Sequence, residues 1–344
     1  MSTIIWKAFF LYKRQKTSSK SMKRPMIKEC EAPMNIIYMG TPEFAVAPLR
    51  ALVEAGHKIQ MVISQPDRPR DRGKKIQPTP VAAAAAELGL PLLQPASIKN
   101  DVELEARLRT LSPDVIIVVA YGKLLPVSYL SLPRYGCVNI HGSLLPRHRG
   151  AAPVQHSILA GDEETGVTLM YLSEGMDEGD MIVSRATKIE TKSAGELLQE
   201  LSHLGASLLT DTLPAIEQGT AARSPQDPAL ATYAPMLTKQ DGHVEFKKGA
   251  VHAERQIRAM DPWPGAFVYY KEDRMKLLKA IVLPETGKGD KTPGQILSVS
   301  DAGLDIQTSS GILRVTKIQM PGKRPMEVSD HLKGNQFEIN CVLR

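Results

Sequence analysis

The segment MNIIYMGTPEFAVAPLRALVEAGHKIQMVIS, residues 34–64, decides the fold class. It opens with an apolar run, Met34–Met39, that ends at a glycine, as a buried strand does. A helix is predicted next, with Thr41 as its N-cap and a stop before Gly56. A second apolar run covers residues 58–64. Strand, helix and strand in this order predict a β-α-β unit and therefore a parallel sheet.

The same alternation continues toward the C-terminus as far as residue 219. Further strands are predicted at residues 114–120, 138–141, 167–172 and 181–189, and helices at residues 81–88, 101–111 and 194–218. The turn after the first strand reads MGTPEF and holds one glycine, whereas a dinucleotide-binding turn needs Gly-x-Gly-x-x-Gly. Residues 34–219 therefore predict a Rossmann-like α/β domain with a mostly parallel sheet, and an NAD-dependent oxidoreductase is disfavoured.

The pattern changes after residue 219. Residues 220–238 are rich in Ala, Pro, Ser and Thr and are predicted to be a linker. One helix is predicted at residues 251–260, followed by strands at residues 266–270, 275–283, 295–299, 304–308 and 312–319. Short strands in such close succession favour a small β-barrel, so residues 239–344 are predicted to form an OB-like domain.

The net charge of +6 is concentrated at the N-terminus. Residues 1–33 carry eight Lys or Arg and two Glu, residues 34–236 carry 18 basic and 22 acidic residues, and residues 237–344 carry 17 and 13. The two predicted domains together are neutral, so binding to a polyanion must depend on local basic patches and on the C-terminal part. No apolar stretch approaches the roughly 18 residues that a membrane span needs. The three cysteines indicate neither a disulfide framework nor a zinc site.

Residues 1–33 form a basic extension, rich in Ser and Lys, that is predicted to be disordered. The simpler interpretation is an upstream extension, or a start codon assigned too early, with Met34 opening the folded domain. The alternative is an organellar transit peptide, because the segment is basic and poor in acidic residues. The first interpretation predicts a cytoplasmic protein, and the second a protein of the mitochondrial matrix.

Asn139 and His141 stand two residues apart on a predicted strand, so their side chains point to the same face. Open α/β sheets bind ligands where parallel strands exit. Asp177, in the later loop EGMDEGD, would complete an acid–base set of amide, imidazole and carboxylate. On spacing alone, a structural hydrogen-bonded pair and a solvated acidic loop are the simpler interpretation.

Two loops are further candidates for ligand contact. The segment SLLPRHRGAAP, residues 143–153, combines prolines, arginines and apolar residues, and either lines a flat heterocycle or lies on the surface. A second loop holds five positive charges against one negative, and either contacts phosphates or is a solvated loop. Its basic residues are Arg68, Arg70, Arg72, Lys74 and Lys75.

Several segments, in chain order, resemble one known family: NIIYMGTPEFAVAPL, QPDRPRDRGKKIQPTPV, VVAYGKLLP, GCVNIHGSLLPRHRGAAPVQHSILAGDEETGVTLMYL, GMDEGDMI and IRAMDPWPGAF. Over residues 34 to about 325 the chain is similar to the methionyl-tRNA formyltransferases. The Asn-x-His, SLLP and Asp-x-Gly-Asp elements are shared with other folate-dependent formyltransferases, including the glycinamide ribonucleotide enzyme. The basic loop and the C-terminal domain indicate the tRNA-specific member.

The resemblance implies a catalytic triad of Asn139, His141 and Asp177, and the superfamily pattern expects the 36-residue interval between His141 and Asp177. It also implies a folate-contacting segment made of Ser143, Leu144, Leu145 and Pro146. The basic loop, Arg68–Lys75, would enter the acceptor stem of the initiator tRNA, and the OB-like domain would bind tRNA. One departure is His148, where a larger aromatic residue such as Trp is expected.

The implied reaction is direct transfer of a formyl group from 10-formyltetrahydrofolate, as co-substrate, to the α-amine of initiator methionyl-tRNA. No metal is expected, and neither is membrane attachment; a monomer is expected. The nearest alternative is a folate-dependent formyltransferase that acts on a small amine, and another is a non-catalytic protein that binds tRNA or folate. A truncation near residue 220 is expected to separate the tRNA enzyme from the small-amine enzyme.

Overall fold

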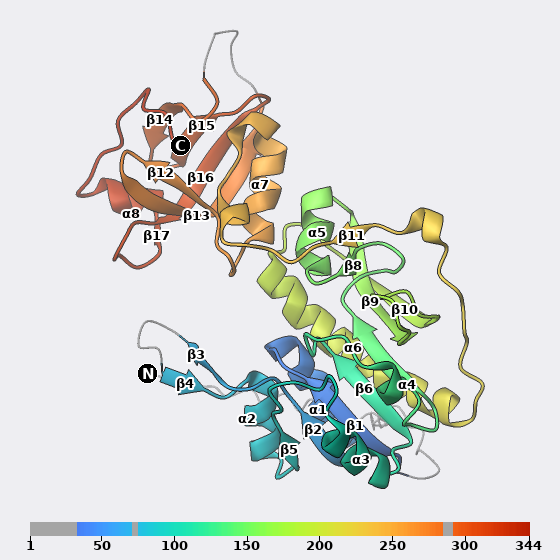
Figure 1. Ribbon diagram of the computed structural model, residues 1–344. Coiled ribbons are helices and arrows are strands. Elements are labelled where there is room, and N and C mark those ends of the chain that lie inside the picture. The colour runs from blue at the N-terminus through green and yellow to red at the C-terminus, as the bar shows by residue number, and fades with distance from the viewer. Residues whose placement is uncertain (1–32, 71–74, 285–291) are drawn as a thin grey trace, which may run out of the picture. The chain divides into compact units, whose positions relative to one another are not determined.

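The computed structural model describes residues 33–70, 75–284 and 292–344 (Figure 1). The N-terminal extension therefore lies outside the described residues, apart from Pro33, and its predicted disorder and targeting role stay predictions. Arg72 and Lys74 of the basic loop also lie outside them. No helix in the described part of the chain is long and apolar enough to cross a membrane.

Within the described ranges, the N-terminal domain is built on a seven-stranded sheet in the order β10-β9-β7-β6-β1-β2-β5. Its strands are β1 (Asn35–Gly40), β2 (Lys58–Ile63), β5 (Leu92–Leu93), β6 (Val115–Val119), β7 (Cys137–His141), β9 (Glu164–Tyr171) and β10 (Met181–Lys188). The strands from β5 to β7 in this order run parallel, whereas β9 and β10 are antiparallel to their neighbours. The predicted Rossmann-like domain with a mostly parallel sheet is confirmed.

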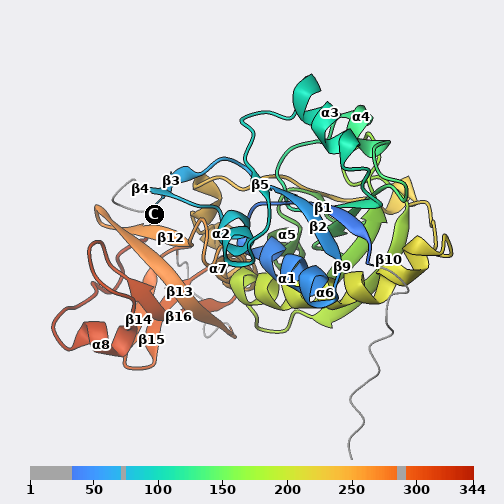
Figure 2. The same cartoon turned by 90° about the horizontal axis from the view of Figure 1, so that it is seen from below.

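Helices cover both faces of this sheet, because the parallel strands are apolar on both sides. The helices are η1 (Glu43–Ala45), α1 (Val46–Glu54), α2 (Pro80–Glu87), α3 (Val102–Thr110), α4 (Val127–Leu130), α5 (Pro153–Ala160) and α6 (Ala194–Glu217). Along β1, Ile36 packs in the same cluster as Leu49 of α1, whereas Ile37 packs in the cluster of Leu108 of α3. Figure 2 shows α1 and α6 on one side of β1 and β2, with α3 and α4 on the other.

One predicted detail of the first turn is wrong. Thr41 was expected to cap the helix, but Pro42 is the N-cap of η1 and α1 begins only at Val46. The Thr41 hydroxyl instead donates to the backbone carbonyl of Tyr121 at 3.1 Å. At the carboxyl edge of the sheet, this hydrogen bond links the loop after β1, which holds Thr41, to the loop after β6, which holds Tyr121.

The C-terminal domain is an antiparallel sheet in the order β12-β13-β16-β15-β14, with β17 paired to β16. Its strands are β12 (Phe267–Tyr270), β13 (Asp273–Leu283), β14 (Ile296–Ser300), β15 (Gly303–Gln307), β16 (Ile312–Gln319) and β17 (Met326–Glu327). Its helices are η3 (Gln240–Gly242), η4 (Phe246–Lys248), α7 (Ala250–Ala259) and α8 (Val328–Leu332). Each predicted strand run of this part overlaps one of β12–β16, and the sheet is consistent with an OB-like barrel.

Two short pairings were not predicted from the sequence. In the basic loop, β3 (Arg68–Arg70) and β4 (Lys75–Gln77) form an antiparallel hairpin. In the linker, a 3-10 helix, η2 (Pro228–Leu230), precedes β11 (Tyr233–Ala234), which pairs in parallel with β8 (Arg149–Gly150). The linker therefore follows the surface of the N-terminal domain from α6 to β11 before it enters the C-terminal domain (Figure 1).

Candidate active site

The strand β7 carries the first two site residues. Asn139 and His141 pair with Met170 and Thr168 of β9, and both side chains are buried. Ile140 between them faces the opposite layer, where it meets Gly205 of α6. The period-two geometry of a strand therefore places the amide and the imidazole on one face, as the sequence predicts.

The His141 imidazole makes contacts through both of its nitrogens. Nε2 lies 2.9 Å from the backbone carbonyl oxygen of His148, and Nδ1 lies 3.6 Å from Oδ2 of Asp177. Because a carbonyl oxygen only accepts, Nε2 carries a proton in this arrangement. Nδ1 then faces the carboxylate favourably only when it is protonated as well. The geometry therefore suits an imidazolium beside an aspartate.

Asp177 occupies the loop between β9 and β10, residues 172–180, which is called the Asp177 loop below. Its φ of 55° lies in the left-handed region, which is uncommon for a residue other than glycine. Its Oδ2 accepts a hydrogen bond from the backbone N–H of Gly150 at 2.8 Å. Residues far apart in the sequence, His141 and Asp177, are thereby brought together through the strand β8.

The Asn139 side chain is buried, with 8% of its surface exposed, and makes no hydrogen bond within the described residues. Its polar atoms keep some contact with solvent, since they are not among the fully enclosed ones without a partner. An uncommitted amide beside an imidazole is an available hydrogen-bond donor. Such a donor can serve an oxygen on a bound ligand.

The SLLP segment follows β7 directly. The hydroxyl of Ser143 donates to the carbonyl of Arg147 at 2.6 Å, and the carbonyl of Ser143 accepts from Thr168 at 2.7 Å. The N–H of Leu145 donates back to the same threonine hydroxyl at 3.1 Å. Ser143 and Leu145 are buried, and Leu144 and Pro146 are partly exposed. The Ser143 side chain is thus used within its own loop, which leaves Leu144 and Pro146 as the accessible members.

His148, the departure from the family pattern, is held by specific partners. Its Nε2 lies 2.7 Å from Oδ2 of Asp162, and its backbone N–H donates to the hydroxyl of Thr232 at 2.8 Å. The side chain is buried, and the residue has a left-handed φ of 58°. An imidazole paired with a carboxylate therefore takes the place where a larger aromatic was expected. This pairing fixes the position of the His148 backbone carbonyl, which accepts the hydrogen bond from Nε2 of His141.

A second group of polar residues lies at the carboxyl ends of β1, β2 and β6. The amide side chain of Gln65 donates to the carbonyl of Tyr121 at 3.3 Å, and its backbone N–H donates to the Thr41 hydroxyl at 3.3 Å. The hydroxyl of Tyr121 is buried without a hydrogen-bond partner in the described part of the chain. Sequence reasoning missed these residues, although each directly follows a predicted strand.

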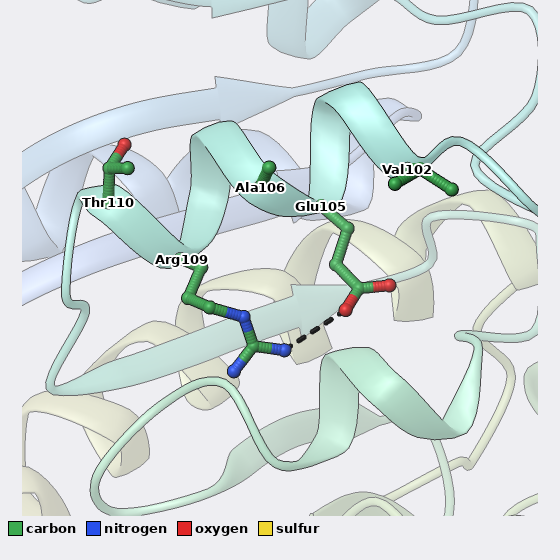
Figure 3. A pocket seen from close by; sticks show the side chains of 5 residues that line it. All are labelled: Val102, Glu105, Ala106, Arg109 and Thr110. Carbon is green, nitrogen blue, oxygen red and sulfur yellow. Dashed lines mark hydrogen bonds and ion pairs between the residues drawn. The ribbon is translucent and has the colours of Figure 1, made fainter.

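The hollow drawn in Figure 3 is a different feature. It lies along α3 and is lined by Val102, Glu105, Ala106, Arg109 and Thr110, with an ion pair of 3.0 Å between Arg109 and Glu105. None of these residues belongs to the predicted site. The site is therefore defined by the convergence of β7, β8 and the Asp177 loop, and not by this hollow. Within the described residues, no group of three or more His, Cys, Asp or Glu is arranged to hold a metal ion.

Comparisons with known proteins identify the family of this chain. Residues 34–213 match the model of the formyl transferase family, and residues 236–336 match that of the formyl transferase C-terminal domain. The methionyl-tRNA formyltransferase of Pelotomaculum thermopropionicum is 44% identical over 311 residues, which cover 90% of this chain and 98% of that protein. The enzyme of the same name from Clostridioides difficile is 41% identical over 311 residues, covering 90% of this chain and 100% of that protein.

Solved structures share the fold at lower identity. One is an N-formyltransferase from Helicobacter canadensis with folinic acid and dTDP-3-aminofucose; its TM-score is 0.61 at 18% identity, covering 83% of this chain and 99% of that one. Another is HypX from Aquifex aeolicus with tetrahydrofolic acid, with a TM-score of 0.58 at 20% identity, covering 88% of this chain and 47% of that one. These likenesses concern the fold alone. On the sequence matches, the chain belongs to the formyl transferase family and, within it, to the methionyl-tRNA formyltransferases.

Proposed function

We propose that this enzyme transfers the formyl group of 10-formyltetrahydrofolate to the α-amine of initiator methionyl-tRNA, and that Asn139, His141 and Asp177 form its catalytic centre. The observation that carries the proposal is the free amide of Asn139 beside the His141–Asp177 pair, at the carboxyl end of a parallel strand. It occurs in a chain that spans 98% of the length of a methionyl-tRNA formyltransferase.

In the proposed step, the α-amine nitrogen attacks the formyl carbon, and a tetrahedral intermediate with a negatively charged oxygen results. A carbon–nitrogen bond to the amine forms, and the bond to N10 of the folate breaks. The Asn139 amide donates a hydrogen bond to the oxyanion. The Nδ1–H of the His141 imidazolium donates a second one, because Nε2–H is engaged by the carbonyl of His148, whereas Nδ1 stands 3.6 Å from Asp177, beyond hydrogen-bond distance. Loss of one such donor typically lowers the rate by about 10²- to 10³-fold.

Asp177 has two tasks in this scheme. Its carboxylate stabilises the positive charge on His141, from which it stands 3.6 Å away. It also helps to move the proton from the attacking amine toward N10, which needs that proton to leave. The set contains no activated Ser or Cys, so the acyl group passes directly between the substrates.

The folate-binding and tRNA-binding segments are those that the family resemblance implies. Leu144 and Pro146 are the accessible members of the folate segment, and Ser143 and Leu145 hold its shape. The basic loop would contact the tRNA acceptor stem; of its described parts, β3 and β4 pair as a hairpin and Arg68 is exposed. Residues 237–344 carry 17 basic and 13 acidic residues, in keeping with a tRNA-binding role for this domain. The monomeric state, the cytoplasmic location and the lack of a metal stay predictions.

The alternative acceptor is a small amine, such as an amino sugar on a nucleotide. Only the fold is shared with an N-formyltransferase of that kind, at 18% identity. The truncation near residue 220 that the sequence suggested is a poor test, because residues 224–234 contact the site loops. The informative assay therefore uses the full chain with 10-formyltetrahydrofolate. It compares methionyl initiator tRNA with methionyl elongator tRNA and dTDP-3-aminofucose; a higher kcat/KM on the amino sugar would refute the proposal.

A further inference from the structure

The linker, residues 220–238, contacts the Asp177 loop at both of its ends. Before the loop, the guanidinium of Arg223 lies over the ring of Tyr171 at 3.7 Å. After the loop, Ser224 and Met181 exchange two backbone hydrogen bonds of 2.9 and 3.0 Å. The linker therefore contacts the residues on both sides of the loop that carries Asp177.

Gln226 contacts the middle of the same loop. Its side-chain amide donates to the backbone carbonyls of Asp177 and Gly179, both at 2.8 Å, and its Oε1 accepts from Nε of Arg149 at 3.0 Å. Arg149 is buried and also lies 3.6 Å from Glu178 of the loop. Gln226 itself is 8% exposed. Both N–H groups and the oxygen of the buried Gln226 amide thus form hydrogen bonds that join the loop to β8.

The linker also fixes β8, which carries the other partners of the site. The N–H of Arg149 donates to the carbonyl of Thr232 at 2.8 Å, and the N–H of Ala151 donates to Ala234 at 2.9 Å. Between these two residues lies Gly150, whose N–H holds the Asp177 carboxylate. The Asp177 carboxylate is therefore held by Gly150 of β8, and the Asp177 backbone carbonyl is held by Gln226. The linker contributes to both restraints, because it bonds to β8 and contains Gln226.

We infer that Gln226 is a positioning residue for the formyl transfer, which sets the place of the Asp177 carboxylate relative to His141. The inference rests on the proposed function of Asp177. The left-handed φ of Asp177 fits such a restraint, because this conformation costs free energy for a residue other than glycine and contacts with the surroundings offset that cost. The linker then supports the catalytic centre from outside as well as connecting it to the C-terminal domain.

The test is the near-isosteric variant Gln226→Glu. A carboxylate cannot donate to the carbonyls of Asp177 and Gly179, whereas it still accepts from Arg149, so the linker stays attached while the loop is released. We expect kcat for initiator methionyl-tRNA to fall by about 10- to 100-fold, with KM for both substrates within about twofold of wild type. A matched control is Gln199→Glu, at an exposed position of α6 whose side chain makes no hydrogen bond among the described residues. Its kcat should equal that of wild type.

A double-mutant cycle separates positioning from a general loss of structure. In an Asp177→Asn background, Gln226→Glu should lower kcat by less than about threefold, because the group that it positions is already inactive. An undiminished fall in that background would overturn the inference, and so would a wild-type kcat for Gln226→Glu alone.

Amide hydrogen exchange gives a readout that does not depend on the substrate. Peptides that cover residues 172–180 should exchange about tenfold faster in Gln226→Glu than in wild type or in Gln199→Glu. Unchanged exchange rates in Gln226→Glu would contradict the inference that Gln226 holds this loop. If the wild-type enzyme fails to formylate methionyl-tRNA, the proposed function fails, and the exchange rates still decide whether Gln226 holds the loop.

Discussion

The substitution Asp177→Asn probes the proposed charge pair with little change in shape. The new side-chain oxygen can still accept from the N–H of Gly150, which lies 2.8 Å from Oδ2 in the native enzyme. The loop should therefore keep its conformation. What is lost is the negative charge at 3.6 Å from Nδ1 of His141 and the ability of the group to accept a proton.

The size of the effect follows from that distance. Two unit charges so placed attract by about 1 kcal/mol in water and by about 5 kcal/mol at an effective dielectric constant of about 20. The Asp177 side chain is 16% exposed, so its environment lies between these limits and nearer to the second. General acid–base catalysis typically contributes about 10²- to 10⁴-fold. We therefore expect kcat to fall by about 10²- to 10³-fold.

The assay is single-turnover formylation of initiator methionyl-tRNA with saturating folate, accompanied by a tRNA-binding measurement. Glu174→Gln is the matched control, because Glu174 is exposed in the same loop and makes no hydrogen bond or ion pair in the described part of the chain. Its rate should stay within about twofold of wild type. The reasoning is refuted if Asp177→Asn binds tRNA normally and reacts within about threefold of the wild-type rate.

Three further outcomes are expected. Replacing the basic residues of the β3–β4 hairpin with Ala should weaken tRNA binding and flatten its salt dependence by about one unit of slope for each phosphate that is no longer neutralised; an unchanged slope would count against the hairpin. Gly205→Ala should lower the free energy of unfolding by about 1–2 kcal/mol in urea, because the added Cβ would lie 2.8 Å from Ile140; greater stability would argue against this close packing. Burial lowers the pKa of His57, so the unfolded chain binds more protons than the folded one below pH about 6.5. The melting temperature should therefore fall as the pH is lowered from about 7.5 to 5.5, and it should fall less in His57→Gln. Parallel curves of melting temperature against pH for the two proteins would contradict the lowered pKa of His57.

The sheet and the strand β7, which carries Asn139 and His141, could be predicted because their information is local. Apolar runs separated by glycines predicted β1 and β2, and the spacing of Asn139 and His141 placed both side chains on one face of β7. The contact between His141 and Asp177 could not follow from spacing, because it depends on how β8 and the Asp177 loop converge. Only the resemblance joined these two residues before the structure did.

The linker shows what composition leaves out. Its Ala, Pro, Ser and Thr content predicts a linker, but no periodic pattern reports that Gln226 donates to two carbonyls of another loop. Thr41 failed as an N-cap for a related reason, since its hydroxyl bonds to Tyr121, which lies 80 residues later. Long-range hydrogen bonds of single side chains are set by tertiary packing, and sequence patterns of short range do not contain them.

The proposed reaction is a stoichiometric transfer of the formyl group from 10-formyltetrahydrofolate to initiator methionyl-tRNA. The most direct measurement incubates the full chain with 10-formyltetrahydrofolate and charged initiator tRNA, and follows formylmethionine on the tRNA together with released tetrahydrofolate. We expect one formylmethionine for each tetrahydrofolate, and formation of both products about 10²- to 10³-fold more slowly in Asp177→Asn. Tetrahydrofolate released without formylmethionine, or formylmethionine made equally well by Asp177→Asn, would contradict this expectation.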